Sequence, residues 1–495
     1  MWPGLHAATT PDKPAVVMAA TGETVTYREL NDRSNQLAQL LFDAGLRFGD
    51  HIAVLMDNNA RYLEVCWAAQ RSGLIYTALN WHFTPEEAAY IIDDCDAQAI
   101  VVSTGTRALA EQLVPLMPRV TIRLAVGGPI GNETDGYVDY DDAIAAFPAE
   151  ELAEELEGTP MLYSSGTTGR PKAVPLRHDT ILGLLDGVIG TLRGGRAGDR
   201  APMPNLVPVS LSLWAGIYQV LFAFRVGAPV VLMEQFSPAE FARLVREHGI
   251  RSSVLPPAAM VMLLQDPAVT SLEPLRYVRS VSAPLSPAHA RAFHDRFGVG
   301  ILNGYGQTEL GGEVIGWSAA DWKEFGAAKL GAVGRPHAGI EVRVRDDELQ
   351  VRSASAPPVD AAALGDRLTA DGWLRTGDLG RVDDDGFVWI DGRVSSMINR
   401  GGLKVFPDEV EEHLRVFAGV ADAGVAGVPD ERLGEVPWAF IVVEPGATID
   451  ADALRAWCRE RMAAYKVPVG VTVVDALPRN EIGKLLRQEL IALVG

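Results

Sequence analysis

The chain has 495 residues, 48% of them hydrophobic and 22% charged, with a formal net charge of −20. This length exceeds what one core usually organises, so we expect at least two folding units of ordinary globular composition rather than a disordered chain. The negative charge argues against duplex DNA or an anionic bilayer as the main partner, because like charges repel. It leaves small anionic ligands open, since a few local cations and backbone amides can hold them.

The cysteines and the N-terminus bear on the compartment. Cys66, Cys95 and Cys458 are odd in number and far apart, which predicts buried thiols in a reducing compartment. No basic segment precedes an apolar one at the N-terminus, and the most apolar long stretch, 211–224, is too short to span a bilayer. We therefore expect a cytoplasmic protein with no membrane span, either a monomer or a homodimer, and a buried helix over 211–224.

Strand and helix patterns alternate along the first part of the chain. We predict a helix from Thr26, a strand over 52–56, a helix over 60–72, a strand over 74–79, a helix from Thr84 and a strand over 99–102. The alternation returns at 228–233 and 238–248. Such alternation indicates α/β architecture with largely parallel, doubly wound sheets.

The pattern changes towards the C-terminus. Short strands separated by turn residues follow Gly334, which predicts a small β-rich subdomain. From Ser395 the pattern predicts a compact α+β unit with a helix over 407–416 and a final helix from about Gly483. We therefore predict two domains, residues 1–394 and residues 395–495.

The strongest local feature is a glycine- and hydroxyl-rich loop between two apolar strands. Glycines let backbone amides approach an anion closely, hydroxyls add donors and a lysine adds charge, so the loop suits a polyphosphate. It is not a Walker motif, because Pro171 stands where that motif needs glycine. A flexible Ser/Gly hairpin is the plainer alternative. The candidate anion-binding residues are Ser164, Ser165, Gly166, Thr167, Thr168, Gly169 and Lys172.

The run Tyr163–Val174 resembles the phosphate loop of the adenylate-forming superfamily, which includes acyl-CoA synthetases, aryl-CoA ligases, luciferases and nonribosomal adenylation domains. It departs only at Ala173, where the family usually has glycine. The resemblance extends over essentially the whole chain. It implies a large N-terminal domain that binds ATP and an acid, followed by a small mobile C-terminal domain.

The resemblance also assigns nucleotide positions in chain order. It places Ala283 and Pro284 at the adenine site, although the family usually has glycine at Val281 or Ser282. In the run Asn303-Gly304-Tyr305-Gly306-Gln307-Thr308-Glu309, it implies that Tyr305 stacks on adenine, Thr308 contacts the α-phosphate and Glu309 holds Mg²⁺. Asp378 would accept hydrogen bonds from the ribose hydroxyls, and Arg393 would contact the nucleotide.

Three further elements follow from the resemblance at the C-terminal side. Ser395 stands at the family hinge, where Asp or Lys is usual. Gly401 and Gly402 would line the passage for the pantetheine arm of coenzyme A. Lys484 would bridge the carboxylate and the α-phosphate during adenylation. The implied catalytic residues are Lys484, Lys172, Thr308 and Glu309, and the implied cofactors are ATP, Mg²⁺ and coenzyme A.

The chemical character of the acid substrate is inferred from candidate pocket residues. Their small and apolar character favours a hydrophobic and bulky small-molecule acid. These residues are Trp214, Ala215, Gly304, Gln307, Gly311 and Gly312.

The function that follows is an AMP-forming acyl-CoA ligase, with two alternatives. Ser210 and Leu211 replace the aromatic residue and histidine of the family's acyl-site element, and Ser395 departs at the hinge. These departures raise the hypothesis of a homologue that performs only thioester formation, on an acyl-adenylate supplied by a separate adenylating partner enzyme. The other alternative is an adenylation enzyme that loads a carrier protein, although no carrier domain is fused to this sequence.

Overall fold

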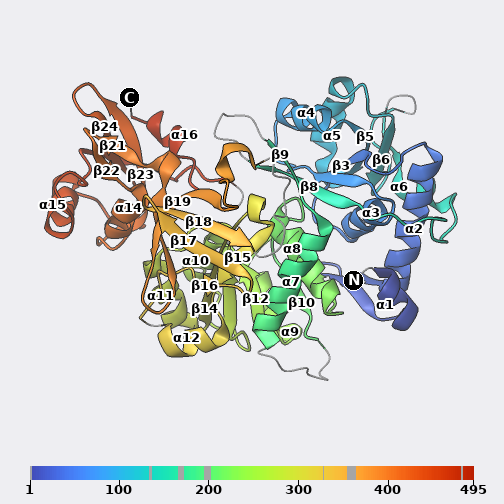
Figure 1. Cartoon of the computed structure of the whole chain (residues 1–495), viewed down its shortest axis with the longest axis horizontal. Coiled ribbons are helices and arrows are strands. Elements are labelled where there is room, and N and C mark those ends of the chain that lie inside the picture. The colour runs from blue at the N-terminus through green and yellow to red at the C-terminus, as the bar shows by residue number, and fades with distance from the viewer. Residues whose placement is uncertain are drawn as a thin grey trace.

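The computed structural model describes residues 3–132, 136–164, 172–193, 202–326, 328–353, 364–480 and 483–494. These residues form five sheets. Figure 1 shows the last of them, coloured orange to red, at one end of the long axis of the molecule. The predicted mixed α/β architecture, with a large N-terminal part and a small C-terminal part, is confirmed.

The largest sheet has seven strands and is parallel except for its last pair. Along β3, Ile52 and Val54 belong to one buried cluster, whereas Ala53 and Leu55 belong to another. Because side chains alternate along a strand, the sheet is covered on both faces, as a doubly wound arrangement requires. In spatial order the strands are β7 (Val138–Asp139), β6 (Ile122–Val126), β5 (Ala97–Ser103), β3 (His51–Leu55), β4 (Ile75–Ala78), β8 (Thr159–Ser164) and β9 (Lys172–Pro175).

Three helices of this part, α2, α3 and α4, begin where the sequence predicts. Thr26 and Thr84 each cap a helix with a capping box, in which the threonine hydroxyl and a glutamate three residues later satisfy backbone amides reciprocally. The helices of this part are α1 (Pro3–Thr9), α2 (Tyr27–Asp43), α3 (Ala60–Arg71), α4 (Pro85–Asp94), α5 (Arg107–Leu113) and α6 (Tyr140–Ala145).

Two further sheets complete the large part. The first has the order β10 (Asn205–Val207), β11 (Val230–Leu232), β1 (Pro14–Met18) and β2 (Thr24–Thr26). The second has the order β12 (Ser252–Leu255), β13 (Tyr277–Ser280), β14 (Gly300–Gln307), β15 (Gly312–Gly316) and β16 (Arg335–Pro336). The accompanying helices are α7 (His178–Arg193), α8 (Trp214–Arg225), α9 (Pro238–Glu247), α10 (Pro257–Gln265), α11 (Pro287–Phe297) and α12 (Ala319–Phe325).

The remaining two sheets confirm that short strands predominate after Gly334. An antiparallel sheet consists of β17 (Ile340–Arg345), β18 (Glu348–Ser353), β19 (Leu374–Val382) and β20 (Val388–Arg393). The C-terminal sheet has the order β22 (Leu403–Val405), β21 (Ile398–Arg400), β24 (Gly434–Val443) and β23 (Val420–Asp430), with β25 (Gly470–Val473) paired to β24. Its helices are α14 (Pro407–Arg415), α15 (Ala451–Arg461) and α16 (Arg487–Ile491).

Two predicted helices start later than expected. The helix predicted over 211–224 begins at Trp214, and Leu211 precedes it as a fully buried residue. The final helix begins at Arg487 rather than near Gly483. Gly483 has a φ of +77°, which a helix does not accommodate, and Arg479 pairs with Leu485 in an antiparallel bridge, so no helix starts at Gly483.

The three cysteines are buried, as predicted. Burial raises the pKa of Cys95 and of Cys458 to about 11, and raises the pKa of Cys66 further. In the part of the chain that the structure describes, no helix combines the length and the hydropathy needed to cross a membrane.

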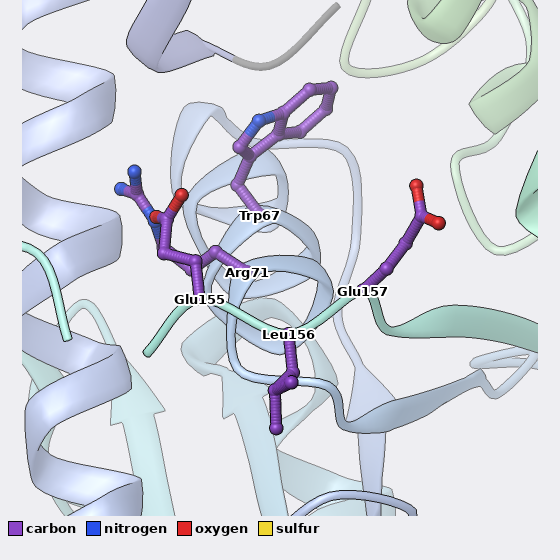
Figure 2. A pocket seen from close by; sticks show the side chains of 5 residues that line it. All are labelled: Trp67, Arg71, Glu155, Leu156 and Glu157. Carbon is purple, nitrogen blue, oxygen red and sulfur yellow. The ribbon is translucent and has the colours of Figure 1, made fainter. Parts of the chain in front are cut away.

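A cavity of about 180 Å³ lies beside α3, away from the predicted site residues. Figure 2 shows Arg71 and Glu155 side by side at one wall, where Arg71 Nε lies 2.7 Å from Glu155 Oε1. Trp67 and Leu156 also line it. None of the residues that line this cavity is a predicted site residue.

Strand β14 changes partner halfway along its length, which brings two glycine-rich segments together. Residues 300–303 pair in parallel with β13, and residues 304–307 pair antiparallel with β15. At this crossing, a Cβ on Gly306 would lie 1.9 Å from the carbonyl oxygen of Gly312. No side chain fits at that distance, so Gly306 is required for the two strands to approach.

Gly306→Ala is therefore expected to lower stability by about 2 kcal/mol or more, because the strands must separate to admit one methyl group. The measurement is the midpoint of thermal unfolding. Gly183→Ala is the matched control: it lies in α7 with nothing within 4 Å of the added Cβ, and should be neutral or slightly stabilising. Equal midpoints for the two variants would contradict this account of the strand crossing.

Candidate active site

A buried carboxylate, Asp378, organises the centre of the predicted site. Asp378 is 7% exposed. Tyr305 Oη donates to Asp378 Oδ2 at 2.6 Å, and Gln307 Nε2 donates to the same oxygen at 2.7 Å. Arg393 Nε lies 2.8 Å from Asp378 Oδ1. We call Tyr305, Gln307, Asp378 and Arg393 the Asp378 cluster; it joins β14, β19 and β20.

The cluster places three of the predicted nucleotide-site residues together. Burial raises the pKa of the Tyr305 phenol well above its usual range, and the negative charge of Asp378 adds to the rise. Tyr305 therefore stays a neutral donor to the carboxylate, and its ring is held in one position. Gln307 is a predicted acid-pocket residue. Its side-chain Nε2 donates both to Asp378 and to the carbonyl of Thr376, the latter at 2.8 Å.

The predicted metal carboxylate is next to this cluster. Thr308 and Glu309 begin a 3₁₀ turn over Thr308–Leu310 that follows β14. Arg367 Nη1 lies 2.7 Å from Glu309 Oε1, and Arg367 Nη2 donates to Gln307 Oε1 at 2.7 Å. Mg²⁺ prefers oxygen ligands and is commonly held by one or two carboxylates plus substrate phosphates. The Glu309 carboxylate fits that donor set.

The predicted phosphate loop lies at the end of the seven-stranded sheet. Ser164 is the last residue of β8 and Lys172 the first of β9, and the two are antiparallel partners. Lys172 is exposed. The remaining loop residues of the prediction lie outside the described part of the chain; these are Ser165, Gly166, Thr167, Thr168 and Gly169.

The predicted adenine segment has an unusual backbone conformation at the place where it departs from the family. Ser282 has a φ of +75°, a left-handed conformation that favours glycine. The expected glycine is thus replaced by a residue that must adopt the glycine conformation. Ala283 and Pro284 follow directly after this turn. Asn303 is buried near the end of the adjacent β14 pairing, and its amide donates to the Ala332 carbonyl at 3.4 Å.

Lys484 approaches the Asp378 cluster from the C-terminal part. A Cβ on Gly483 would lie 2.8 Å from Cβ of Ala258, so Gly483, directly before Lys484, packs against α10 of the large part. Burial lowers the pKa of Lys484, the positive charge of Arg393 lowers it further, and Asp378 opposes both. The structure therefore brings Lys484 into the electrostatic range of two predicted nucleotide residues that are about a hundred positions away in sequence.

The other C-terminal candidates lie on turns. Ser395 is exposed in the 3₁₀ turn Val394–Ser396, directly after β20. Gly401 and Gly402, with φ of +59° and +91°, form the two-residue turn between β21 and β22. Positive φ at both central residues is typical of hairpin turns that match strand twist, and it explains both glycines. The backbone N–H of Gly402 also donates to Asn399 Oδ1 at 2.9 Å.

The predicted acid-pocket residues are grouped around the start of α8 and the β14–β15 crossing. Trp214 Nε1 donates to the Gly311 carbonyl at 3.2 Å. A Cβ on Gly312 would lie 3.2 Å from the Tyr218 ring and 3.7 Å from the Trp214 indole. Ala215 lies on the first turn of the same helix. A Cβ on Gly304 would meet the Glu313 carboxylate at 2.7 Å.

Sequence reasoning missed a buried charged group behind these glycines. Arg279 forms an ion pair with Glu313, and His337 Nε2 lies 3.0 Å from Glu313 Oε1. Arg279 also donates to the Trp317 carbonyl at 3.2 Å. Arg279 lies in β13 and Glu313 in β15, so a charged residue inside each of two strands is the signal that marks the pair. The pairing itself depends on strand register and could not be read from one sequence.

The residue that replaces the family histidine is a core residue. Leu211 is fully buried in the main core, and its backbone N–H donates to Asn58 Oδ1 at 2.7 Å. The hydroxyls of Ser210 and Ser212 lie 2.7 Å apart and bond to one another.

Comparison with known proteins gives a consistent result. The AMP-binding enzyme family model matches residues 5–357, and the model of the AMP-binding enzyme C-terminal domain matches residues 409–484. The chain is 30% identical to the fatty acid–[acyl-carrier-protein] ligase ScoC of Streptomyces coeruleorubidus, over 98% of this chain and 94% of that protein. It is 31% identical to 4-coumarate–CoA ligase-like 5 of Oryza sativa subsp. japonica, over 98% and 88%.

A solved structure with the same fold carries a bound acyl-adenylate. It is that of the anthranilate CoA ligase AuaEII in complex with anthranoyl-AMP. The two chains are 26% identical with a TM-score of 0.85, covering 99% of this chain and 96% of that chain.

The buried charged group yields a stability prediction. Glu313→Ala would leave Arg279 buried without its counter-charge, which typically costs about 3 kcal/mol or more. We expect a clearly lower midpoint of urea unfolding. Glu324→Ala, which removes an exposed carboxylate on α12, is the control and should change stability by less than about 0.5 kcal/mol. An unchanged midpoint for Glu313→Ala would mean that Arg279 finds other compensation.

Proposed function

Because the chain belongs to the family of AMP-binding enzymes, and is an AMP-forming acid–thiol ligase that uses ATP, Mg²⁺ and coenzyme A, we propose that it makes the acyl-CoA of a hydrophobic, bulky acid. The observation that carries the proposal is the convergence on Asp378. Tyr305 and Arg393 contact this carboxylate directly, and Lys484 lies within its electrostatic range. We also propose residues 1–394 and 395–495 as its two domains, and the cytoplasm as its location.

In the first half-reaction, a carboxylate oxygen of the acid attacks the α-phosphorus of ATP and pyrophosphate leaves. Tyr305 and Asp378 orient the nucleoside, and Lys484 stabilises negative charge that builds up on the transferring group. The loop between Ser164 and Lys172 holds the departing pyrophosphate, and Thr308 contacts the α-phosphate. Mg²⁺, held by Glu309, would supply charge neutralisation on the phosphate oxygens.

In the second half-reaction, the thiolate of coenzyme A attacks the acyl carbonyl and AMP leaves with the electron pair of the broken bond. We propose that the C-terminal domain turns about Ser395 between the two steps. This rotation of the domain removes Lys484 from the site and brings the Gly401–Gly402 hairpin to it. Small exposed residues at element ends absorb such dihedral changes well.

The acid specificity follows from the walls of the candidate pocket. Trp214 and the Tyr218 ring pack over Gly312, which supports an apolar or aromatic acid. The Arg279 guanidinium is already paired with Glu313 and offers no free cation to a second carboxylate. We therefore propose a monocarboxylic substrate.

The test of this function is AMP release from ATP with a panel of acids that includes benzoate, cinnamate, octanoate and succinate. We expect release with coenzyme A present for at least one apolar acid, and little for succinate. No release with any acid would overturn the proposed ligase activity. Preference for succinate would overturn the proposed pocket chemistry alone.

One relative favours a second acceptor. The 30% identical ScoC is a fatty acid–[acyl-carrier-protein] ligase, so a phosphopantetheinylated carrier protein is a competing acceptor. Parallel assays with coenzyme A and with such a carrier protein distinguish the two. Acid-dependent ATP–pyrophosphate exchange separately tests the thioesterification-only alternative, which robust exchange would exclude.

The roles assigned to Lys484 predict a split between the half-reactions. Lys484→Ala should lower ATP–pyrophosphate exchange by about 10²-fold or more, because one charge at the transition state is lost. It should leave thioester formation from preformed acyl-AMP nearly unchanged. Lys323→Ala, which removes an exposed lysine on α12, is the control. Equal loss of both half-reactions in Lys484→Ala would contradict the assignment.

The lowered pKa of Lys484 also predicts a pH dependence. Lys484 must be protonated to stabilise the transition state, and its pKa is depressed mainly by burial. The exchange rate should therefore fall on the alkaline side at a pH below the usual lysine value of about 10.4. In Lys484→Arg, which stays charged throughout, this alkaline fall should move to higher pH. The same profile in both proteins would assign the titration to another group.

A further inference from the structure

Arg367 makes contacts that the proposed reaction does not yet use. It ends the 3₁₀ turn Gly365–Arg367, which no motif in the sequence marks. Its guanidinium spans two residues of the site, with Nη1 2.7 Å from Glu309 Oε1 and Nη2 2.7 Å from Gln307 Oε1. Its Nε donates to the carbonyl of Arg375 at 3.1 Å.

These contacts place a positive charge on the proposed metal ligand. Glu309 Oε1 accepts a hydrogen bond from Arg367 Nη1 at 2.7 Å, so one of its lone pairs is occupied. Mg²⁺ needs near-ideal geometry at its oxygen ligands. The two cations also repel each other. Metal binding at Glu309 therefore requires Arg367 to move.

Arg367 is placed to move. Its side chain is 34% exposed, against 19% for Glu309, and it is anchored to main chain through a single bond. A guanidinium binds phosphate oxygens bidentately and more strongly than it binds a neutral amide. The triphosphate of ATP would bring such oxygens to the side of the site where Glu309 lies.

We propose that Arg367 occupies the metal carboxylate in the nucleotide-free protein and transfers to the triphosphate when ATP binds with its metal ion. Arg367 is then a phosphate-binding residue of the ligase and a barrier to binding of the bare metal. The metal enters only together with the nucleotide. This inference rests on the proposed role of Glu309.

The exchange also links the two carboxylates of the site. Gln307 accepts from Arg367 through its oxygen and donates to Asp378 through its nitrogen. Departure of Arg367 frees the Gln307 oxygen next to the ribose-binding carboxylate. Nucleotide binding at Asp378 and the departure of Arg367 from Glu309 are thereby coupled through one side-chain amide.

The test measures metal and nucleotide binding in the full-length protein. Mn²⁺ serves as the metal probe, and free Mn²⁺ is followed by electron paramagnetic resonance without nucleotide. Arg367→Ala should bind Mn²⁺ about tenfold more tightly than the wild type, and its ATP dissociation constant with Mg²⁺ should rise about tenfold by calorimetry. Arg367→Lys, which keeps the charge without the fork, should keep Mn²⁺ binding weak.

The matched control is Arg375→Ala. Its exposed side chain pairs with Glu348, and its backbone carbonyl, which anchors Arg367, is retained. This variant should bind Mn²⁺ and ATP as the wild type does. Thermal midpoints and circular dichroism of each variant check folding.

Four outcomes would overturn the inference. Unchanged Mn²⁺ affinity in Arg367→Ala would show that no exchange occurs, and weaker Mn²⁺ binding would make Arg367 a support of the metal site. Unchanged ATP affinity would remove the phosphate role. The double variant Arg367→Ala with Glu309→Gln should lose the gain in Mn²⁺ affinity. If it does not, the role of Glu309 fails, while AMP release by the wild type tests the ligase activity independently.

Discussion

The site depends on one buried carboxylate that contacts three other side chains. Asp378 accepts from Tyr305 and Gln307 on one oxygen and pairs with Arg393 on the other. A buried charge is tolerated only when it is paired and hydrogen-bonded, so each partner is required in its place. Because these partners come from different sheets, the carboxylate fixes the relative position of β14, β19 and β20. It also fixes Arg393, the last residue of β20.

The crossing of β14 and β15 imposes the second constraint. Gly306 leaves no room for a side chain against Gly312, and Gly304 lies against the Glu313 carboxylate. The glycines of this motif therefore bring two strands to contact distance, with the Asp378 cluster and the candidate acid pocket beside the crossing. The Arg279–Glu313 pair occupies the space behind them. The pair places polar groups in the interior instead of apolar side chains, and each of these buried groups needs a hydrogen-bond partner.

Much of this architecture could be predicted from the sequence. Helix starts at Thr26 and Thr84 were recognisable, because capping residues act locally. Lys484 and Asp378 were found as motif members, although only the fold shows that their charges interact. Arg367 and the Arg279–Glu313–His337 group were not foreseen. Their partners are set by strand register and by a short irregular turn, which leave no periodic trace in the sequence.

The departures from the family pattern are also sorted by the structure. Ser282 has a left-handed backbone, which favours glycine, so a serine at this position is strained. Leu211 lies in the core. Ser395 is exposed at the junction between β20 and β21, where the chain passes from the large part to the small one.

The burial of all three cysteines has a practical consequence. Cys66, Cys95 and Cys458 are enclosed, and burial raises the pKa of each thiol, so none is a ready thiolate for alkylating reagents near neutral pH. A cysteine introduced on the surface would thus be labelled selectively in an otherwise native chain. Fluorophores attached on either side of the junction could report the distance between the large and small parts in solution during turnover.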